Sequence, residues 1–355
     1  MDQEEHIKYM RRCLDLASKA LGLTYPNPLV GAVIVCEGKI IGEGYHLKAG
    51  GPHAEVLAIN SVSDRSLLRK SVLYVNLEPC SHYGKTPPCA DLIISEGIRK
   101  VVIGAEDTSE KVAGKGIEKL KNAGCEVITG VLEKECRHLN RRFYTTVEKQ
   151  RPYIILKWAQ SADGFIDIVR PENASVRPLW ITGNTERVLV HRWRSEEQAI
   201  LAGAGTIRAD NPQLNVRDWT GSHPLRIVLT RSGDIGQNHA FSSTNGTYLV
   251  FTYNMDCNFP EPVKVRLTEG IPASRQIADY LWDRNIYSLF IEGGREVHNH
   301  FITTGMWDEA RVFTGNERFK NGVRAPELKD MVKKSHTVYG NSVLDVYEHR
   351  FTSSL

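Results

Sequence analysis

The order of apolar and polar positions divides the chain into two halves, each with alternating helices and strands. In the first half, apolar residues recur at helical spacing over residues 9–21 and predict an amphipathic helix. Short apolar runs predict strands at residues 30–35, 71–77, 101–104 and 126–128. Glu37-Gly38-Lys39 predicts a hairpin turn into a strand at residues 40–42, and two further helices should begin at Pro52 and near Cys89. This rhythm predicts a sheet covered by helices on both faces.

The alternation breaks around residues 141–151, where polar residues and Pro152 precede a new apolar run at 153–158. We place the domain boundary there and expect one domain at residues 1–147 and another at 148–355. Further strands are predicted at residues 200–202, 226–229, 247–251, 288–292 and 309–313. Helices are predicted at residues 185–194, 274–284 and 297–304. Both domains are therefore expected to be α/β.

Composition and charge narrow the classes of protein. The 355 residues carry a net charge of +3, too small to indicate a nucleic-acid or membrane surface. Residues 1–22 lack the apolar core of a signal peptide, and no later apolar run is long enough to span a membrane. The seven cysteines are an odd number scattered along the chain, which favours reduced thiols and a cytoplasmic location.

The candidate chemistry is concentrated in His53-Ala54-Glu55, Pro79-Cys80 and Cys89. One imidazole and two thiolates are good zinc ligands, and three protein ligands leave the fourth position open for water. Zinc lowers the pKa of that water, which makes hydroxide available near neutral pH. Glu55 need not bind the metal and is placed to carry the proton of the water to a leaving amine. We therefore expect a zinc deaminase with metal ligands His53, Cys80 and Cys89 and catalytic Glu55.

The surrounding motifs resemble a known family. They include Pro26-Asn27-Pro28, Gly42-Glu43-Gly44-Tyr45-His46 and the run from Leu77 to Cys89, in which eight residues separate the two cysteines. Together they resemble the deaminase half of the bifunctional riboflavin-biosynthesis deaminase/reductase, in which that wide spacing is typical. The resemblance implies a cytidine-deaminase-like three-layer α/β/α fold.

The same resemblance implies substrate contacts in the first domain at Asn27, Lys85, Thr86 and Asp107. Lys85 could meet a substrate phosphate or be a solvated loop residue. The residues after Asp107, Thr108-Ser109-Glu110, depart from the Pro-Asn-Pro that is common in the family. His46 is an extra imidazole that could bind substrate or pack, and we do not count it as a metal ligand.

The second half resembles the reductase half of the same enzyme, which is related to dihydrofolate reductase and uses NADPH. The motifs are the run from Leu156 to Gly164, Trp180-Ile181-Thr182, His191-Arg192-Trp193-Arg194, Ala202-Gly203-Ala204-Gly205-Thr206, Ala209-Asp210-Asn211-Pro212 and Ile291-Glu292-Gly293-Gly294. Gly293-Gly294 ends a strand and opens a helix, where bare N–H groups and the helix dipole suit a pyrophosphate. By itself such a pair is more often a tight turn, and the ordinary G-x-G-x-x-G run is absent. A dihydrofolate-reductase-like α/β domain is expected.

Carried over position by position, the resemblance implies cofactor contacts at Ala159, Trp180, Thr206, Asp210, Gly294, Arg295, Glu296, Val297, His298, Asn299 and His300. It implies substrate contacts at Arg194, Leu214, Arg217 and Glu292. The two guanidinium groups suit a phosphate, although each could also be a solvated surface side chain. Pro178 replaces a substrate-contacting Ser of the family, and Thr230 stands where relatives often have Asp. Lys157 and Glu292 are our candidates for catalysis in this domain.

The expected function is two consecutive steps of riboflavin biosynthesis. Zinc-dependent deamination of a diaminopyrimidinone ribosylamino 5′-phosphate would be followed by NADPH-dependent reduction of its ribosyl group to ribityl. The expected partners are small-molecule substrates and further copies of the chain, in a dimer or tetramer, with neither nucleic acid nor membrane. One alternative, a deaminase with an RNA-binding second domain, is disfavoured by the low net charge. A non-catalytic binding or oligomerisation module in the second half stays open because of Pro178 and Thr230.

Overall fold

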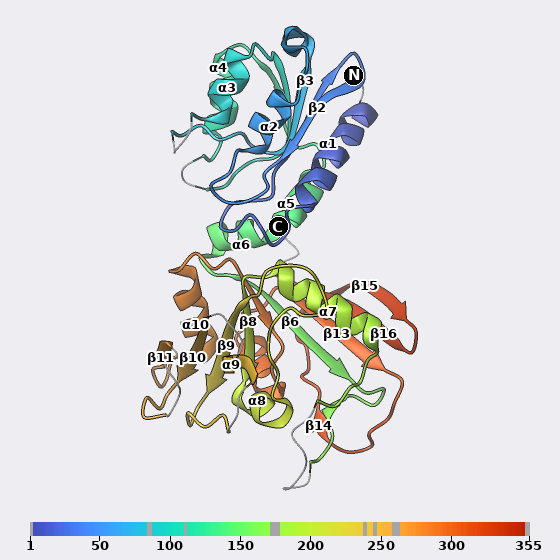
Figure 1. Ribbon diagram of the computed structural model, residues 1–355, viewed down its shortest axis with the longest axis vertical. Coiled ribbons are helices and arrows are strands. Elements are labelled where there is room, and N and C mark those ends of the chain that lie inside the picture. The colour runs from blue at the N-terminus through green and yellow to red at the C-terminus, as the bar shows by residue number, and fades with distance from the viewer. Residues whose placement is uncertain are drawn as a thin grey trace. The chain divides into compact units, whose positions relative to one another are not determined.

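The computed structural model describes residues 3–83, 87–109, 112–170, 178–236, 240–243, 247–257 and 263–351. The chain divides between Gln150 and Arg151 into two compact units (Figure 1). Among the described helices, none combines the length and apolar character needed to cross a membrane.

The first unit contains the elements that the apolar pattern predicts. Its helices are α1 (Gln3–Ser18), α2 (Ala54–Asn60), the 3-10 helix η1 (Arg65–Lys70), α3 (Cys89–Ser95), α4 (Lys115–Asn122), α5 (Glu133–Leu139) and α6 (Arg141–Lys149). Its strands are β1 (Gly31–Cys36), β2 (Lys39–Tyr45), β3 (Val72–Leu77), β4 (Lys100–Ala105) and β5 (Glu126–Ile128). Helix α6 occupies most of residues 141–151, where the apolar pattern is lost, and the chain divides into its two units just after this helix.

A single sheet forms the middle layer of the first unit. Its strand order is β2-β1-β3-β4-β5, in which β3, β4 and β5 are parallel while β1 runs antiparallel to both β2 and β3. One core cluster joins Ile34 and Val75 to α2, α3 and α4, and the other joins Val33 and Tyr74 to α1, α5 and α6. The cytidine-deaminase-like three-layer arrangement is confirmed, with both faces of the sheet covered.

The second unit is also α/β. Its strands are β6 (Tyr153–Gln160), β7 (Phe165–Asp167), β8 (Ala199–Gly203), β9 (Leu225–Thr230), β10 (Tyr248–Thr252), β11 (Val263–Arg266), β12 (Ser288–Ile291), β13 (Glu309–Gly315), β14 (Val323–Arg324), β15 (Met331–Tyr339) and β16 (Ser342–His349). Its helices are α7 (Asn184–Glu196), α8 (Ala204–Asp210), α9 (Ala240–Ser243), α10 (Ala273–Trp282) and α11 (Arg295–Ile302).

The large sheet of this unit has the order β11-β10-β9-β8-β12-β6-β13-β16-β15. The strands from β11 to β13 are parallel, and β16 and β15 add an antiparallel edge. Helices α10 and α11 pack on one face with Ile154 and Leu156, while α7, α8 and α9 pack on the other with Tyr153 and Ile155. The parallel order places the carboxyl ends of β6, β8, β9 and β12 along one edge, where open α/β sheets bind ligands.

The first unit should fold by itself when the chain is shortened to residues 1–150. Both core clusters that cover its sheet consist of residues before Gln150, so the fragment keeps its whole interior. We expect one cooperative thermal transition by circular dichroism, and the same for residues 151–355. A fragment that is soluble but melts without a transition would contradict this division of the chain.

Candidate active sites

Three metal-binding side chains converge in the first unit. His53 precedes α2, Cys80 follows β3 and Cys89 begins α3, so three separate elements supply them. His53 Nδ1 lies 3.5 Å from Cys80 Sγ and 3.3 Å from Cys89 Sγ. Two zinc ligands of these types stand roughly 3.6 Å apart when their bond lengths and a tetrahedral angle are combined. Among the described residues this trio is the group whose ligand atoms could hold a metal, and its donor set fits zinc.

The trio also favours the form of cysteine that binds zinc. The main-chain N–H of Cys89 donates to Cys80 Sγ at 3.3 Å. Hydrogen bonds from Cys89 and His53 hold the pKa of Cys80 well below its usual range, against the opposing effect of burial. Thiolate is the zinc-binding form of cysteine, so this environment prepares the site for a metal.

Glu55 lies in the first turn of α2 and is only 3% exposed. Burial raises the pKa of its carboxyl group to about 7, and the negative charge of Cys80 adds to this effect. The side chain stands beside the metal-binding trio without being part of it. A carboxyl group in this position can take up and release a proton near neutral pH.

A second imidazole forms part of the wall near the trio. His46 Nδ1–H donates to the carbonyl oxygen of Pro52 at 3.0 Å, so its Nε2 accepts from Asn27 Nδ2 at 3.0 Å. The ring lies edge-on to His53, with 5.6 Å between the centroids. Asn27 is thus oriented by His46, a role that the sequence left open. Lys85 and Thr86 lie outside the described residues.

Glu78 is a buried carboxylate whose role the sequence analysis missed. It lies two residues before Cys80 and is 4% exposed. Its two oxygens accept main-chain N–H groups from Asp107 at 3.2 Å, Gly114 at 3.0 Å, Gly116 at 2.9 Å and Ile117 at 3.2 Å. The only signal in the sequence was an acidic residue at the end of a buried strand.

Asp107 follows β4 and lies in this same region of the unit. Its carboxylate accepts the N–H of Ser109 at 2.8 Å. Burial raises the pKa of Asp107, although its hydrogen bonds with Ser109 oppose the shift. Through Glu78, the segment that carries Asp107 is attached to the strand end that carries Cys80.

The second unit contains a cleft of about 1140 Å³ at the carboxyl edge of its large sheet. Most of the residues expected to bind cofactor or substrate line it: Lys157, Ala159, Trp180, Arg194, Thr206, Asp210, Leu214, Arg217, Glu292, Gly294, Arg295, Glu296, Val297 and His300. Pro178 and Thr230 line it as well. His298 and Asn299 belong to α11 but are outside this lining set of described residues.

Three charged side chains from three elements meet inside this cleft. Arg194 of α7 donates to Glu292 through Nε at 2.6 Å and through Nη2 at 2.9 Å. Lys157 of β6 places its ammonium nitrogen 3.7 Å from the same carboxylate. Burial acts to raise the pKa of Glu292, but Arg194 and Lys157 outweigh it and lower that pKa to about 2. Burial lowers the pKa of Lys157, partly opposed by Glu292.

The turn from β12 into α11 is tightly packed. A Cβ atom on Gly293 would lie 2.8 Å from Val297 Cβ and 3.2 Å from the main-chain nitrogen of Gly203. Gly294 precedes the helix without a side-chain cap, so main-chain N–H groups of its first turn stay available for a ligand. The close approach of Val297 and Gly203 thus explains why position 293 is a glycine, which the sequence alone could not do.

His298 lies behind this turn and is fully buried. Its Nδ1 lies 3.0 Å from the carbonyl oxygen of Gly294, and its Nε2 lies 3.2 Å from that of Lys157. The imidazole therefore connects the start of α11 to β6. In this geometry, His298 would affect a bound cofactor indirectly, by positioning the main chain at Gly294 and Lys157.

Comparison with known proteins finds a matching protein family for each half of the chain. A family model described as the cytidine and deoxycytidylate deaminase zinc-binding region matches residues 3–105, and one described as the RibD C-terminal domain matches residues 152–316. Riboflavin biosynthesis protein RibD of Aquifex aeolicus is 38% identical over 334 residues, which is 92% of each chain. RibD of Escherichia coli is 35% identical and covers 88% of this chain and 87% of its own.

Solved structures give the same result. A Thermotoga maritima diaminohydroxyphosphoribosylaminopyrimidine deaminase/5-amino-6-(5-phosphoribosylamino)uracil reductase is 37% identical, with a TM-score of 0.89 over 98% of this chain and 99% of its own. RibD of Acinetobacter baumannii is 30% identical, with a TM-score of 0.86 over the same shares. With identity of this level across nearly the whole length of both chains, the chain belongs to the RibD family of riboflavin-biosynthesis proteins.

Proposed function

We propose that this chain catalyses two consecutive steps of riboflavin biosynthesis. The first unit removes the 2-amino group of 2,5-diamino-6-ribosylamino-4(3H)-pyrimidinone 5′-phosphate as ammonia, and the second reduces the ribosyl group to ribityl. The observation that carries the proposal is that each unit has its own built site: the His53, Cys80 and Cys89 trio in one and the charged cleft in the other. A second unit without catalysis is disfavoured, because a merely structural domain has no need of Lys157, Glu292 and Arg194 in a large cleft.

In the first unit, we assign the metal to His53, Cys80 and Cys89. Zinc supplies a Lewis acid there that makes water nucleophilic near neutral pH. Glu55 takes the proton of the attacking water and passes it to the departing amino group. Asn27 is held by His46 and binds the pyrimidine ring, and Lys85, Thr86 and Asp107 are proposed to contact the rest of the substrate.

In the second unit, bound NADPH would supply the hydride for reduction at C1 of the sugar. The first turn of α11 after Gly294 holds the pyrophosphate, while Ala159, Trp180, Thr206 and Asp210 contact the rest of the cofactor. Lys157 delivers the proton that the reduction consumes, and Glu292 holds the ammonium group in place.

Substrate phosphate is assigned to Arg194 and Arg217, with Leu214 beside them. We expect the enzyme to act in the cytoplasm as a homo-oligomer, a dimer or a tetramer.

The direct test uses the full chain loaded with zinc. Ammonia release from the diaminopyrimidinone phosphate and NADPH oxidation with the deaminated intermediate should both be observed. Deamination without NADPH oxidation would support the alternative in which the second unit only binds.

Two variants of the first unit should separate metal binding from proton transfer. Cys89→Ser should lose zinc and ammonia release together, because one of three ligands is gone. Glu55→Gln should keep its zinc while turnover falls by roughly 10²-fold, the usual scale for general acid–base catalysis. Zinc content by mass spectrometry and ammonia release are measured on the same samples. The control is Cys125→Ser, a buried thiol that donates to Ile98 elsewhere in the unit and should keep both properties. Loss of zinc from Glu55→Gln would instead make Glu55 a ligand.

Glu292→Gln should impair reduction and leave deamination intact. The neutral amide no longer holds the ammonium of Lys157 or pairs with Arg194. We expect NADPH oxidation to fall by roughly 10²-fold, on the scale of a lost general acid–base group. Both half-reactions and the melting temperature should be measured. A normal reduction rate with a lowered melting temperature would leave Glu292 with a structural role only.

A further inference from the structure

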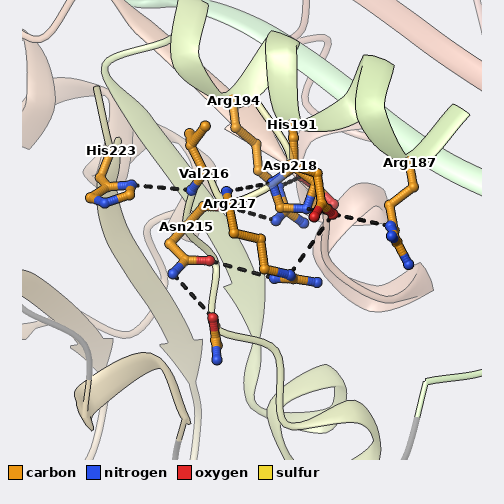
Figure 2. A network of polar contacts seen from close by, with 10 residues as sticks. Arg187, His191, Arg194, Asn215, Val216, Arg217, Asp218 and His223 are labelled. Carbon is orange, nitrogen blue, oxygen red and sulfur yellow. Dashed lines mark hydrogen bonds and ion pairs between the residues drawn. The ribbon is translucent and has the colours of Figure 1, made fainter. Parts of the chain in front are cut away.

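A network of polar contacts lies between one face of α7 and the segment that follows α8 (Figure 2). Arg187, His191 and Arg194 are four and three residues apart on α7, so they share a face of the helix. Opposite them lie Asn215, Val216, Arg217 and Asp218. His191 is 1% exposed at the centre of this network.

His191 contacts two consecutive residues of that segment. The main-chain N–H of Arg217 donates to His191 Nδ1 at 3.1 Å, so this nitrogen carries no proton. The proton is therefore on Nε2, which lies 3.3 Å from Asp218 Oδ2. The neutral imidazole thus holds the main chain of Arg217 by a hydrogen bond and lies against the carboxylate of Asp218, whose Oδ2 is within ion-pair distance but forms no hydrogen bond with the described residues.

The segment depends on such contacts because residues 211–224 contain neither helix nor strand. Arg194 Nη1 donates to the carbonyl oxygen of Asn215 at 2.9 Å. His223 Nδ1 accepts the N–H of Val216 at 3.2 Å. Together with His191, these side chains hold three consecutive residues whose main chain would otherwise be free to rearrange.

Two neighbours contact the side chain of Arg217: the carboxylate of Asp218, and Asn215, whose Oδ1 accepts from Arg217 Nη1 at 3.4 Å. Asp218 Oδ2 lies 3.0 Å from Arg187 Nε and 3.9 Å from Arg217 Nε. Arg194 is already engaged by Glu292, whereas the Arg217 side chain is 43% exposed and lines the cleft. Arg217 is therefore the guanidinium of this group that is better placed to meet a ligand.

The charge of the group suits a phosphate dianion. Among the described residues, the cations Arg187, Arg194, Arg217 and Lys157 form their ion pairs with two carboxylates, Asp218 and Glu292. Two positive charges are therefore left within this group of six, and a doubly ionised phosphate ester would balance them.

We propose that His191 is a positioning residue for substrate phosphate in the reductase cleft. It holds the main chain of Arg217 by a hydrogen bond and packs against Asp218, so that the Arg217 guanidinium faces the cleft before substrate arrives. This inference rests on the proposed function, since it takes the phosphate of the ribosylamino substrate as the ligand of Arg217. The preorganised loop lowers the conformational cost of binding without touching the reacting atoms.

The neutral state that this role needs is favoured by the surroundings. Burial, and then the positive charges of Arg194 and Arg217, lower the pKa of His191 to about 4, while Asp218 and Glu292 oppose the shift. Near neutral pH the ring therefore keeps the unprotonated Nδ1 that accepts the N–H of Arg217.

The experiment compares two polar replacements in the full-length, zinc-loaded enzyme. Asn places an amide oxygen near the position of Nδ1 and can still accept the N–H of Arg217, whereas Gln places its amide near the position of Nε2. We expect His191→Gln to raise KM for the phosphorylated reductase substrate about tenfold, the scale of one lost hydrogen bond to a positioned group. His191→Asn should recover most of that loss. In both variants, kcat and the KM for NADPH should change less than twofold.

Two further measurements identify phosphate as the ligand. The dephosphorylated substrate should show the same kcat/KM in His191→Gln as in the native enzyme, because it lacks the group that Arg217 holds. Competitive inhibition by inorganic phosphate should weaken in parallel with KM. The control is Arg192→Gln on the same helix, where the side chain is 53% exposed and paired with Glu196, and it should leave every constant unchanged.

The outcomes separate two kinds of failure. If Arg217→Ala leaves KM for the phosphorylated substrate unchanged, the phosphate site in the proposed function is wrong. If Arg217→Ala raises that KM but His191→Gln does not, or if His191→Asn and His191→Gln are equally impaired, the role of His191 is refuted. Equal losses on phosphorylated and dephosphorylated substrate would also refute it, since they would indicate general packing.

Discussion

In each unit, a carboxylate shielded from water needs hydrogen-bond or ion-pair partners, and these partners bring several elements together. An ionised carboxylate taken from water into the protein is strongly unfavourable unless partners replace its hydration. In the second unit, Glu292 follows a central strand and is compensated by Arg194 from α7 and Lys157 from β6. Because removing Glu292 would take the shared carboxylate from two cations, and removing Arg194 would leave Glu292 with Lys157 as its ion-pair partner among the described residues, this ionic group ties a helix and two neighbouring strands together at the cleft. The geometry of the cleft is thus coupled to the stability of the unit.

The first unit solves the same problem with main-chain groups instead of cations. Glu78 collects four N–H groups from residues 107–117, a segment that belongs neither to β3 nor to the metal-binding trio. Gly116 approaches so closely that a Cβ atom there would lie 2.1 Å from the carbonyl oxygen of Pro79. A side chain at position 116 would separate Glu78 from its donors. One contact region therefore holds the strand end before Cys80 together with Asp107 and with residues 114–117.

The sequence predicted most of the regular elements, because apolar periodicity records which side of each element is buried. It also predicted the metal trio, since imidazole and thiolate ligands carry their chemistry in their residue type. It did not predict α8, which begins between Gly203 and Gly205, nor the antiparallel edge formed by β15 and β16. Every residue of β15 except Tyr339 is exposed, so no alternation of buried and exposed positions marks this strand. The roles of Glu78 and His191 were missed for a different reason. The hydrogen-bond partners of Glu78 are at least 29 residues away in the sequence, and that of His191 is 26 residues away. The local pattern around each residue indicates only that it is near a buried element.

Three buried imidazoles show why residue type alone could not define the sites. Burial lowers the pKa of His46, His191 and His298, so each ring is neutral near pH 7 and has one donor and one acceptor. His46 uses both and links Pro52 to Asn27, whereas His191 accepts the main-chain N–H of Arg217 while its Nε2 lies 3.3 Å from Asp218 Oδ2. His298 faces two carbonyl oxygens instead, and a neutral ring can donate to only one of them. A lysine could not accept in place of His46 or His191. A neutral imidazole that accepts one N–H while its second nitrogen lies against another polar group therefore helps loops without secondary structure to keep a fixed shape beside each site.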